Sequence, residues 1–503
     1  MNGNLYEIIK SRFPEDPDAP CLFLPGGDVV SYGDLEKESA RCAGVLASLG
    51  VKAGDRVAVQ VRKSPQALFL YLGCLRAGAV YLPMNDAYQR HEIEYFLGDA
   101  TPQVFVCRPQ VRALADELAR KTGVARVIEL DDNGGGELAA EAAAQPDHFT
   151  TIARADNDLA AILYTSGTTG RSKGAMLSHR NLAANAEVLH RYWSFRPGDV
   201  LLHMLPIFHV HGLFVATHCT LLNGSPMLFE PRFDAKRAVE LIPRATVFMG
   251  VPTYYVRLLA DPGFTRGLCA KMRLFVSGSA PLLLETFNEF KTRIGHTILE
   301  RYGMTEGNMF TSNPYDGERR GGTVGFPLPG VSIRIVDEEN RPLRASEIGQ
   351  IQVKGENVFR GYWRMPEKTR EEFTEDGFFK TGDMGKRDDD GYISIVGRSK
   401  DVIITGGLNV YPKEIEEIID TMPGVVESAV IGIPHPDFGE AVVAIIVRLD
   451  NEAGAALTEA GVIGQLKGLL ANFKVPKRVH FVGDLPRNSM GKVQKKVLRE
   501  QYA

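Results

Sequence analysis

Apolar positions near the start of the chain alternate between helical and strand-like spacing. A helical pattern over residues 31–49 is followed by a short apolar run at 56–61, a second helical pattern at 64–76 and another run at 79–82. Helices that alternate with short apolar strands are typical of parallel sheets covered by helices. This part of the chain is therefore predicted to be α/β.

The same alternation returns between residues 245 and 299, where short apolar runs are separated by helical patterns. We expect one large N-terminal body of parallel-type sheets with helices over residues 1–397. The segment 131–144 is rich in Gly, Ala and acidic residues, and it is predicted to be a surface connection without an element of its own.

The pattern changes near the C-terminus, where short charged turns precede a strand, a helix at 412–420 and strands at 426–433 and 441–447. Such a mixture over about a hundred residues is enough for a small, mobile α+β domain. We expect this domain to cover residues 398–503, with Lys400 at the hinge.

Composition narrows the possible functions. The 503 residues include 58 Lys and Arg and 62 Asp and Glu, so the net charge of −4 gives no excess of cations for binding nucleic acid or an anionic membrane. Six dispersed cysteines contain no C-x-x-C pair, which favours reduced structural thiols. Residues 200–229 lack charged side chains but are broken by Pro and Gly, so we expect buried strands and a helix there. No signal peptide is visible, and a cytoplasmic location is expected.

The strongest local signal is the loop YTSGTTGRSKG at residues 164–174, between two apolar runs. Hydroxyl groups, backbone N–H groups and the Lys173 ammonium can together surround a phosphate. The candidate ligands are Thr165, Ser166, Gly167, Thr168, Thr169 and Lys173. The loop does not fit the G-x-x-x-x-G-K-[ST] pattern, which argues against a kinase or a switch GTPase.

Together with five further motifs in order along the chain, this loop resembles the phosphate-binding signature of the adenylate-forming superfamily of acyl-CoA synthetases, luciferases and adenylation domains. The other motifs are RYGMTE at 301–306, YW at 362–363, FKTGD at 379–383, GRSKD at 397–401 and PRNSMGK at 486–492. The resemblance covers the whole chain. It implies ATP, Mg²⁺ and coenzyme A as the cofactor and co-substrates.

The resemblance also implies roles for individual residues. Lys492 and Lys173 would neutralise charge as a carboxylate attacks the α-phosphorus of ATP. Glu306 would be the third catalytic residue and would hold the magnesium ion. Asp383 has two oxygens suited to the two ribose hydroxyls, and Arg398 would bind ribose or phosphate. The other expected nucleotide contacts are Ser277, Gly278, Ser279, Ala280, Arg301, Tyr302, Gly303, Met304 and Thr305.

A second half-reaction requires a thiol to reach the acyl-adenylate. The resemblance implies that the C-terminal domain rotates about Lys400, which withdraws Lys492 and brings Gly406 and Gly407 to the path of coenzyme A, where a missing Cβ permits close approach. Acetylation of Lys492 by a lysine acetyltransferase would remove its charge and stop adenylation.

The acid substrate is inferred from the predicted acyl pocket. Phe208 and His209 stand where amino-acid-activating relatives place an Asp, so an amino acid lacks its usual anchor. Arg257 interrupts an apolar helical face, and a buried unpaired cation requires an anion. Arg257, His211 and Ser279 are therefore the expected ligands of a second carboxylate, and the segments around them resemble malonyl-CoA synthetases. Gly307, where many relatives carry Thr, is expected to enlarge the pocket enough for methylmalonate.

The leading hypothesis is thus ATP-dependent ligation of malonate to coenzyme A through an acyl-adenylate, with release of AMP and pyrophosphate. The alternatives are a short-chain or aromatic acyl-CoA synthetase, and an adenylating enzyme that loads a carrier-protein thiol. A nucleotide-binding regulator without catalysis is disfavoured by the presence of Lys492, Glu306 and Lys173.

Overall fold

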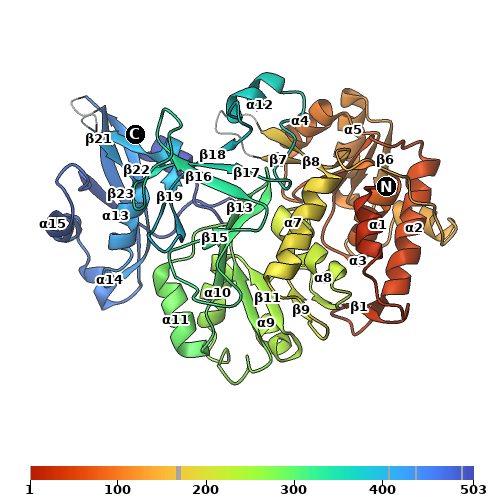
Figure 1. Cartoon of the computed structure of the whole chain (residues 1–503), viewed down its shortest axis with the longest axis horizontal. Helices are drawn as coiled ribbons and strands as arrows, with labels where there is room; N and C mark the ends of the chain where they lie inside the picture. Colours follow the sequence, from red (N-terminus) through yellow and green to blue (C-terminus); the bar gives the residue numbers. More distant parts are fainter. Residues whose placement is uncertain (1, 166–171, 406–407, 437–438, 489–490) are drawn as a thin grey trace.

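The computed structural model describes residues 2–165, 172–405, 408–436, 439–488 and 491–503. Their strands form four sheets, which are arranged along the molecule from the N-terminal part at one end to the C-terminal part at the other (Figure 1). The model confirms the predicted α/β class, with a large N-terminal body and a smaller C-terminal α+β part.

A six-stranded sheet holds the N-terminal strands in the order β6-β5-β3-β4-β7-β8, and all neighbours are parallel except β7 and β8. Its strands are β3 (Arg56–Gln60), β4 (Val80–Pro83), β5 (Val104–Cys107), β6 (Arg126–Glu129), β7 (Leu159–Thr165) and β8 (Lys173–Ser178). Helix α2 (Tyr32–Ser48) precedes β3, and α3 (Pro65–Arg76), α4 (Arg90–Ala100) and α5 (Arg112–Thr122) connect the strands from β3 to β6. Ser31 and Ser64 cap α2 and α3, which confirms the predicted helix starts.

A nine-stranded sheet follows, in the order β15-β14-β13-β12-β11-β9-β10-β1-β2, with parallel pairing from β13 to β1. Its strands are β1 (Pro20–Phe23), β2 (Val29–Ser31), β9 (Leu201–His203), β10 (Met227–Phe229), β11 (Val247–Gly250), β12 (Leu274–Ser277), β13 (Leu299–Met304), β14 (Asn308–Ser312) and β15 (Phe326–Pro327). The helices beside it include α7 (His179–Tyr192), the π-helix η2 (His211–Thr217), α8 (His218–Leu222), α9 (Ala235–Leu241), α10 (Pro252–Leu259) and α11 (Leu284–Ile294).

The uncharged segment 200–229 folds as predicted into buried elements. They are the strands β9 and β10 of this sheet and the helices η2 and α8 beside it. Among the described residues, no helix combines the length and the apolar character that crossing a membrane requires.

A four-stranded sheet lies inside the predicted N-terminal body but is antiparallel throughout. It contains β16 (Ser332–Val336), β17 (Gly349–Lys354), β18 (Phe379–Arg387) and β19 (Ile393–Arg398), with α12 (Pro366–Glu372) between β17 and β18. The expectation of parallel-type sheets does not hold here, because short turns such as that between β18 and β19 join antiparallel neighbours.

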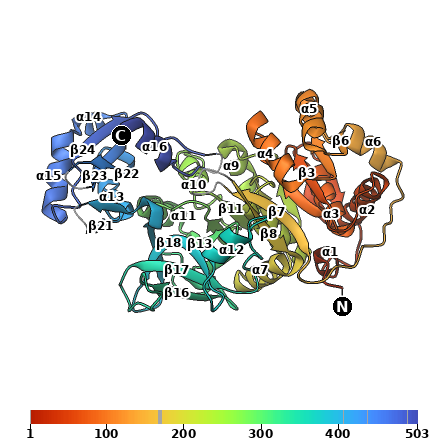
Figure 2. The same cartoon turned by 90° about the horizontal axis from the view of Figure 1, so that it is seen from above.

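The C-terminal part contains β20 (Ile403–Thr405), β21 (Leu408–Val410), β22 (Val425–His435), β23 (Gly439–Arg448) and β24 (Arg478–Val482) in one sheet. Its helices are α13 (Pro412–Ile419), α14 (Glu452–Ala456), α15 (Glu459–Leu469) and α16 (Lys495–Tyr502). It has its own apolar core, around residues such as Ile415, Val442 and Leu466. Figure 2 shows it at the end of the molecule opposite the six-stranded sheet.

Two details concern expectations made from composition. The segment 131–144 is not merely a connection, because it contains α6 (Glu137–Ala143). Leu138 and Ala142 are buried on that helix, so an apolar pair one turn apart is enough to hold it against α2. All six cysteines are buried and free, as expected for structural thiols.

Candidate active site

Four of the predicted site residues lie together near the carboxyl ends of β12 and β13: His211 and Ser279, predicted for the acid, and Ser277 and Arg301, predicted for the nucleotide. In open α/β sheets this edge is where ligands bind. β12 ends at Ser277, and Gly278 and Ser279 follow it directly; Ser279 has a backbone φ of 73°. We call the cluster formed by Ser277, Ser279, His211 and Arg301 the acyl corner.

His211 is the first residue of η2 and is almost completely buried. Its Nδ1 lies 3.3 Å from the Ser279 hydroxyl, while its Nε2 is buried without a hydrogen-bond partner among the described residues. Burial, followed by the positive charge of Arg301, holds the pKa of His211 well below its usual value. The ring is therefore neutral at pH 7. If Nδ1 accepts from Ser279, Nε2 carries a proton for which the described part of the chain offers no acceptor.

Arg301 is a buried cation in the same corner, and burial lowers its pKa to about 9 against the opposing effects of Tyr255 and Glu300. A Cβ on Gly278 would lie 2.4 Å from the Arg301 Cζ, so glycine is needed for the guanidinium to pack there. Nε and Nη2 of Arg301, and the Ser277 hydroxyl, have no partner among the described residues. Buried polar groups of this kind cost free energy unless a ligand or water pairs with them.

Asp383 and Arg398 face each other across β18 and β19. The Asp383 carboxylate accepts a hydrogen bond from the Tyr302 hydroxyl at 2.5 Å and forms an ion pair with Arg398 Nε at 2.6 Å. Burial opposes the charge of Arg398, but Asp383 and the other neighbouring acidic groups outweigh it and raise the pKa of the guanidinium. The structure thus brings together three residues that the sequence predicted for nucleotide binding.

Glu306 lies buried in the turn between β13 and β14, where its Oε1 accepts from the Tyr362 hydroxyl at 3.0 Å. Burial raises the pKa of this carboxyl, although Tyr362, Arg398 and Lys173 oppose the shift. Lys173, on β8, lies with its Nζ 4.1 Å from the centre of the Tyr362 ring and 3.4 Å from Glu372 Oε1.

A magnesium ion would fit at Glu306 in one specific way. Within the described ranges, no three or more His, Cys, Asp or Glu side chains are grouped as a metal site. Mg²⁺ commonly binds through one or two carboxylates together with substrate phosphates. One oxygen of Glu306 is held by the Tyr362 hydroxyl, which orients the carboxylate, and Lys173 lies over the face of the Tyr362 ring.

Lys492 reaches this region from the C-terminal part. A Cβ on its neighbour Gly491 would lie 3.8 Å from the Thr253 side chain, so the tail touches α10. Lys492 is exposed by surface area, yet protein atoms surround it, as in an open cleft. Crowding by protein and then the charge of Arg398 lower its pKa, against the attraction of Asp383 and Glu306.

Arg257 corrects a premise of the sequence analysis. The side chain is exposed rather than buried, so water can solvate its charge and burial does not force it to find an anion. It lies one helical turn after Thr253 and therefore on the same face of α10. Gly491 lies beside Thr253 on this face. Its role toward a carboxylate stays a prediction.

Gly307 also corrects an expectation. A Cβ at this position would lie 2.2 Å from Cε1 of Phe310, whose ring is fully buried. The space that a side chain would take is thus filled by Phe310, and the glycine does not enlarge a pocket.

The remaining predicted residues are placed as follows. Thr165 ends β7, and its hydroxyl lies 3.4 Å from the Lys173 carbonyl oxygen. Ala280, Gly303, Met304 and Thr305 are half-buried near the same strand ends. Lys400 is exposed in η4 (Ser399–Asp401), between β19 and β20. Ser166, Gly167, Thr168, Thr169, Gly406 and Gly407 lie outside the described residues.

Sequence reasoning missed two contacts of the catalytic candidates. The Tyr362 hydroxyl holds Glu306, and Glu372 pairs with Lys173. The YW motif drew attention to Tyr362 without indicating its partner. Glu372 lies 199 residues from Lys173 and carries no local signal.

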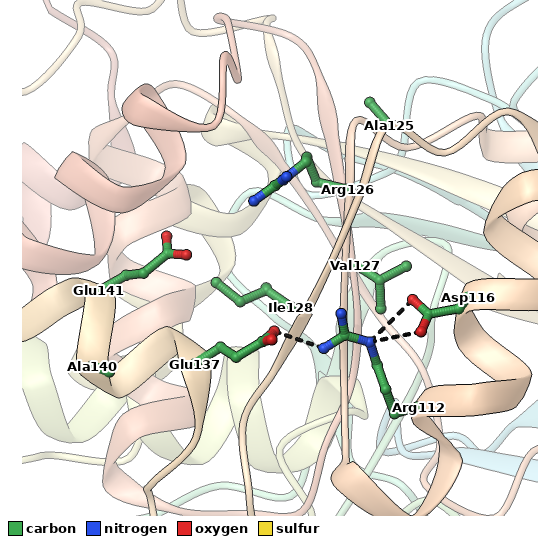
Figure 3. Close-up of a pocket in the computed structure, with 9 residues that line it drawn as sticks. All are labelled: Arg112, Asp116, Ala125, Arg126, Val127, Ile128, Glu137, Ala140 and Glu141. Carbon is green, nitrogen blue, oxygen red and sulfur yellow. Dashed lines mark hydrogen bonds and ion pairs between the residues drawn. The ribbon is translucent and has the colours of Figure 1, made fainter.

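A separate surface hollow of about 430 Å³ lies beside β6, between α5 and α6 (Figure 3). Arg112 there is paired with Asp116 at 3.0 Å and with Glu137 at 2.7 Å. None of the predicted site residues that the structure describes lines this hollow.

Comparison with known families and structures agrees with the motifs. Residues 10–363 match the AMP-binding enzyme family, and residues 414–492 match the AMP-binding enzyme C-terminal domain.

Individual relatives cover nearly the whole chain. A malonate–CoA ligase of Arabidopsis thaliana is 34% identical over 99% of this chain and 89% of its own. A sulfoacetate–CoA ligase of Cupriavidus necator is 34% identical over 98% of this chain and 96% of its own. The ATP-bound crystal structure of MatB from Rhodopseudomonas palustris is 56% identical, covers 100% of this chain and 99% of its own, and superposes with a TM-score of 0.97. The chain therefore belongs to the AMP-binding enzyme family.

Proposed function

We propose that this protein is a malonyl-CoA synthetase, which ligates malonate to coenzyme A at the expense of ATP. The observation that carries the proposal is the acyl corner, where the buried His211 Nε2 has no acceptor among the described residues while Ser279 lies 3.3 Å from Nδ1. The similarity to a malonate–CoA ligase supports the same substrate.

The first step joins the acid to ATP. A malonate carboxylate oxygen attacks the α-phosphorus, the bond to the bridging oxygen breaks, and pyrophosphate leaves. Lys492 and Lys173 offset the negative charge that collects in the transition state. Asp383 binds the ribose hydroxyls, which displace its contacts with Tyr302 or Arg398. A magnesium ion, held by Glu306 and the phosphates, would polarise the phosphoryl oxygens.

The distal carboxylate of malonate is bound by His211, Ser279 and Arg257. The His211 Nε2–H donates to a carboxylate oxygen, which gives a partner to a buried donor that has none among the residues described in the structure. Arg257, which is exposed on α10, is assigned the role of attracting the same carboxylate by its positive charge. A monocarboxylate of similar size would leave both groups unpaired and would be a poorer substrate.

The second step transfers the acyl group to sulfur. The coenzyme A thiolate attacks the acyl carbon, and AMP leaves with the electrons of the broken C–O bond. We divide the chain into residues 1–397 and 398–503 and place the hinge at Lys400, which is exposed between β19 and β20. Rotation there would withdraw Lys492 and bring Gly406 and Gly407 toward the thiol. Regulation by acetylation of Lys492 and a cytoplasmic location stay predictions.

The test is a panel of acids assayed with ATP and free coenzyme A. We expect malonate to give the highest kcat/KM, with AMP and pyrophosphate as products, above methylmalonate, succinate, sulfoacetate, butyrate and benzoate. A preference for sulfoacetate would support binding of a distal anionic group but would change the assigned substrate. Equal rates with butyrate would overturn the proposal. Pyrophosphate exchange without CoA turnover would indicate a carrier-protein thiol, and no exchange with any acid would indicate a regulator.

A further inference from the structure

Lys63 is a buried lysine outside the catalytic residues described above. It follows β3, is only 9% exposed, and lies with its Nζ 4.3 Å from the centre of the Phe229 ring. The Nζ is 2.8 Å from both Nδ1 and the carbonyl oxygen of His203, at the end of β9. Burial holds the pKa of Lys63 well below its usual value, and the nearby Glu230 carboxylate opposes this shift.

This contact fixes the protonation of the His203 ring. Its Nε2 lies 3.0 Å from the Gly212 carbonyl oxygen, which can only accept, so Nε2 must carry the proton. Burial and the charge of Lys63 hold the pKa of His203 well below its usual value, so the ring is neutral. Nδ1 is then an acceptor, and Lys63 is its donor.

Gly212 links this pair to the acyl corner. Its carbonyl oxygen accepts from His203 Nε2 and, at 2.9 Å, from the Thr217 hydroxyl. A Cβ on Gly212 would lie 2.0 Å from the Pro206 carbonyl oxygen, so η2 begins with the backbone pressed against the preceding loop. His211 is the adjacent residue, and a short π-helix such as η2 is a form often found at functional sites.

We propose that Lys63 is a positioning residue for the acid substrate: it fixes the tautomer of His203, which pins the Gly212 carbonyl and thereby sets the position of the His211 ring. The proposal rests on the proposed function in assigning His211 to the acid. Lys63 itself touches neither substrate nor nucleotide. Its loss is expected to weaken acid binding with little change in ATP binding.

The test is a double-mutant cycle between Lys63→Met and His211→Ala, read as the KM for malonate in pyrophosphate exchange. Lys63→Met alone is expected to raise this KM about tenfold, with the KM for ATP unchanged, and to add less than about twofold in the His211→Ala background. Lys63→Arg, which retains donors and charge, should restore part of the loss. The matched control is Lys52→Met, an exposed lysine of the same region, whose KM should equal that of the wild type.

Thr217→Val is a milder change to the contacts around the Gly212 carbonyl oxygen. It replaces Lys63→Met in the test if the Lys63→Met variant does not fold. It removes the hydroxyl from the Gly212 carbonyl and is expected to raise the malonate KM about threefold, again only while His211 is present. Additive effects of either variant with His211→Ala, or an equal rise in the KM for ATP, would overturn the positioning role. Failure of the proposed function is distinguishable, because the wild-type protein would then show no preference for malonate.

Discussion

The acyl corner and the nucleotide side of the site differ in whether their buried polar groups have hydrogen-bond or ion-pair partners. At the acyl corner, His211 Nε2, the Ser277 hydroxyl and two nitrogens of Arg301 are buried without partners among the described residues. On the nucleotide side, Asp383 pairs with Arg398, Glu306 with Tyr362, and Lys173 with Glu372. One region lacks partners that a ligand can supply, whereas the other must exchange existing partners for those of ATP.

The difference has a consequence for binding. A buried donor without an acceptor costs about 1–3 kcal/mol, which an acid of the right shape recovers when it binds. ATP gains less from each contact, because breaking a pair such as Asp383 with Arg398 offsets part of the new interaction. We therefore expect the acyl corner to contribute most to the choice of acid substrate. The nucleotide side is expected to contribute mainly by compensating the negative charge of ATP.

The largest expected effect comes from removing the positive charge of Lys492, which belongs to the C-terminal part of the chain. Lys492→Ala should lower malonate-dependent pyrophosphate exchange by at least about 10³-fold, because the electrostatic term of the transition state is lost. Thiolation of chemically prepared malonyl-adenylate should remain near the wild-type rate. Lys496→Ala, at a lysine whose side chain is 78% exposed, is the control. Equal loss in both half-reactions would contradict the role of Lys492.

A smaller effect is expected from crowding the wall next to Glu306. Gly307→Thr places a Cβ 2.2 Å from a Phe310 ring atom and should lower the free energy of unfolding by about 1–3 kcal/mol, as overpacking of a core does. Thermal unfolding measures this loss, and Gly307→Thr combined with Phe310→Leu should recover part of it.

Gly267→Thr is the matched control, since nothing lies within 4 Å of a Cβ at that glycine. An unchanged melting temperature for Gly307→Thr would contradict this expectation, because it would mean that the Phe310 ring can move to accommodate the new side chain at little cost.

The smallest perturbation is a change of pH, which should affect the rate of adenylation and the KM for malonate differently. Lys492 has a lowered pKa, so raising the pH neutralises it earlier than an ordinary lysine, and Glu306 has a raised pKa, so lowering the pH protonates it earlier than an ordinary glutamate. The rate of adenylation should fall on both sides of neutrality. The KM for malonate should stay flat from about pH 6 to 8, since burial keeps His211 neutral throughout that range. A malonate KM that follows a titration near pH 6.5 would contradict this.

Local patterns were sufficient for much of the fold. The helical patterns predicted to begin at residues 31 and 64 agree with the structure, where Ser31 and Ser64 cap α2 and α3. Six motifs in order identified the superfamily, and the structure brings Asp383 and Arg398 within 2.6 Å of each other, although they come from different motifs.

Properties that depend on the surroundings of a side chain could not be predicted from its neighbours in sequence. Arg257 looked buried because apolar residues flank it, but its side chain is exposed on α10. Gly307 looked like empty space, yet Phe310, three residues on, folds back into it. The contact of Lys63 with His203 spans 140 residues and leaves no local trace.

The most direct test of the account is the selectivity of Arg257→Leu. The ratio of kcat/KM for malonate to that for butyrate should fall at least about 30-fold, because only malonate offers a second carboxylate to the guanidinium. Equal losses with both acids, or no loss with either, would contradict the claim that this cleft selects its substrate by the distal negative charge.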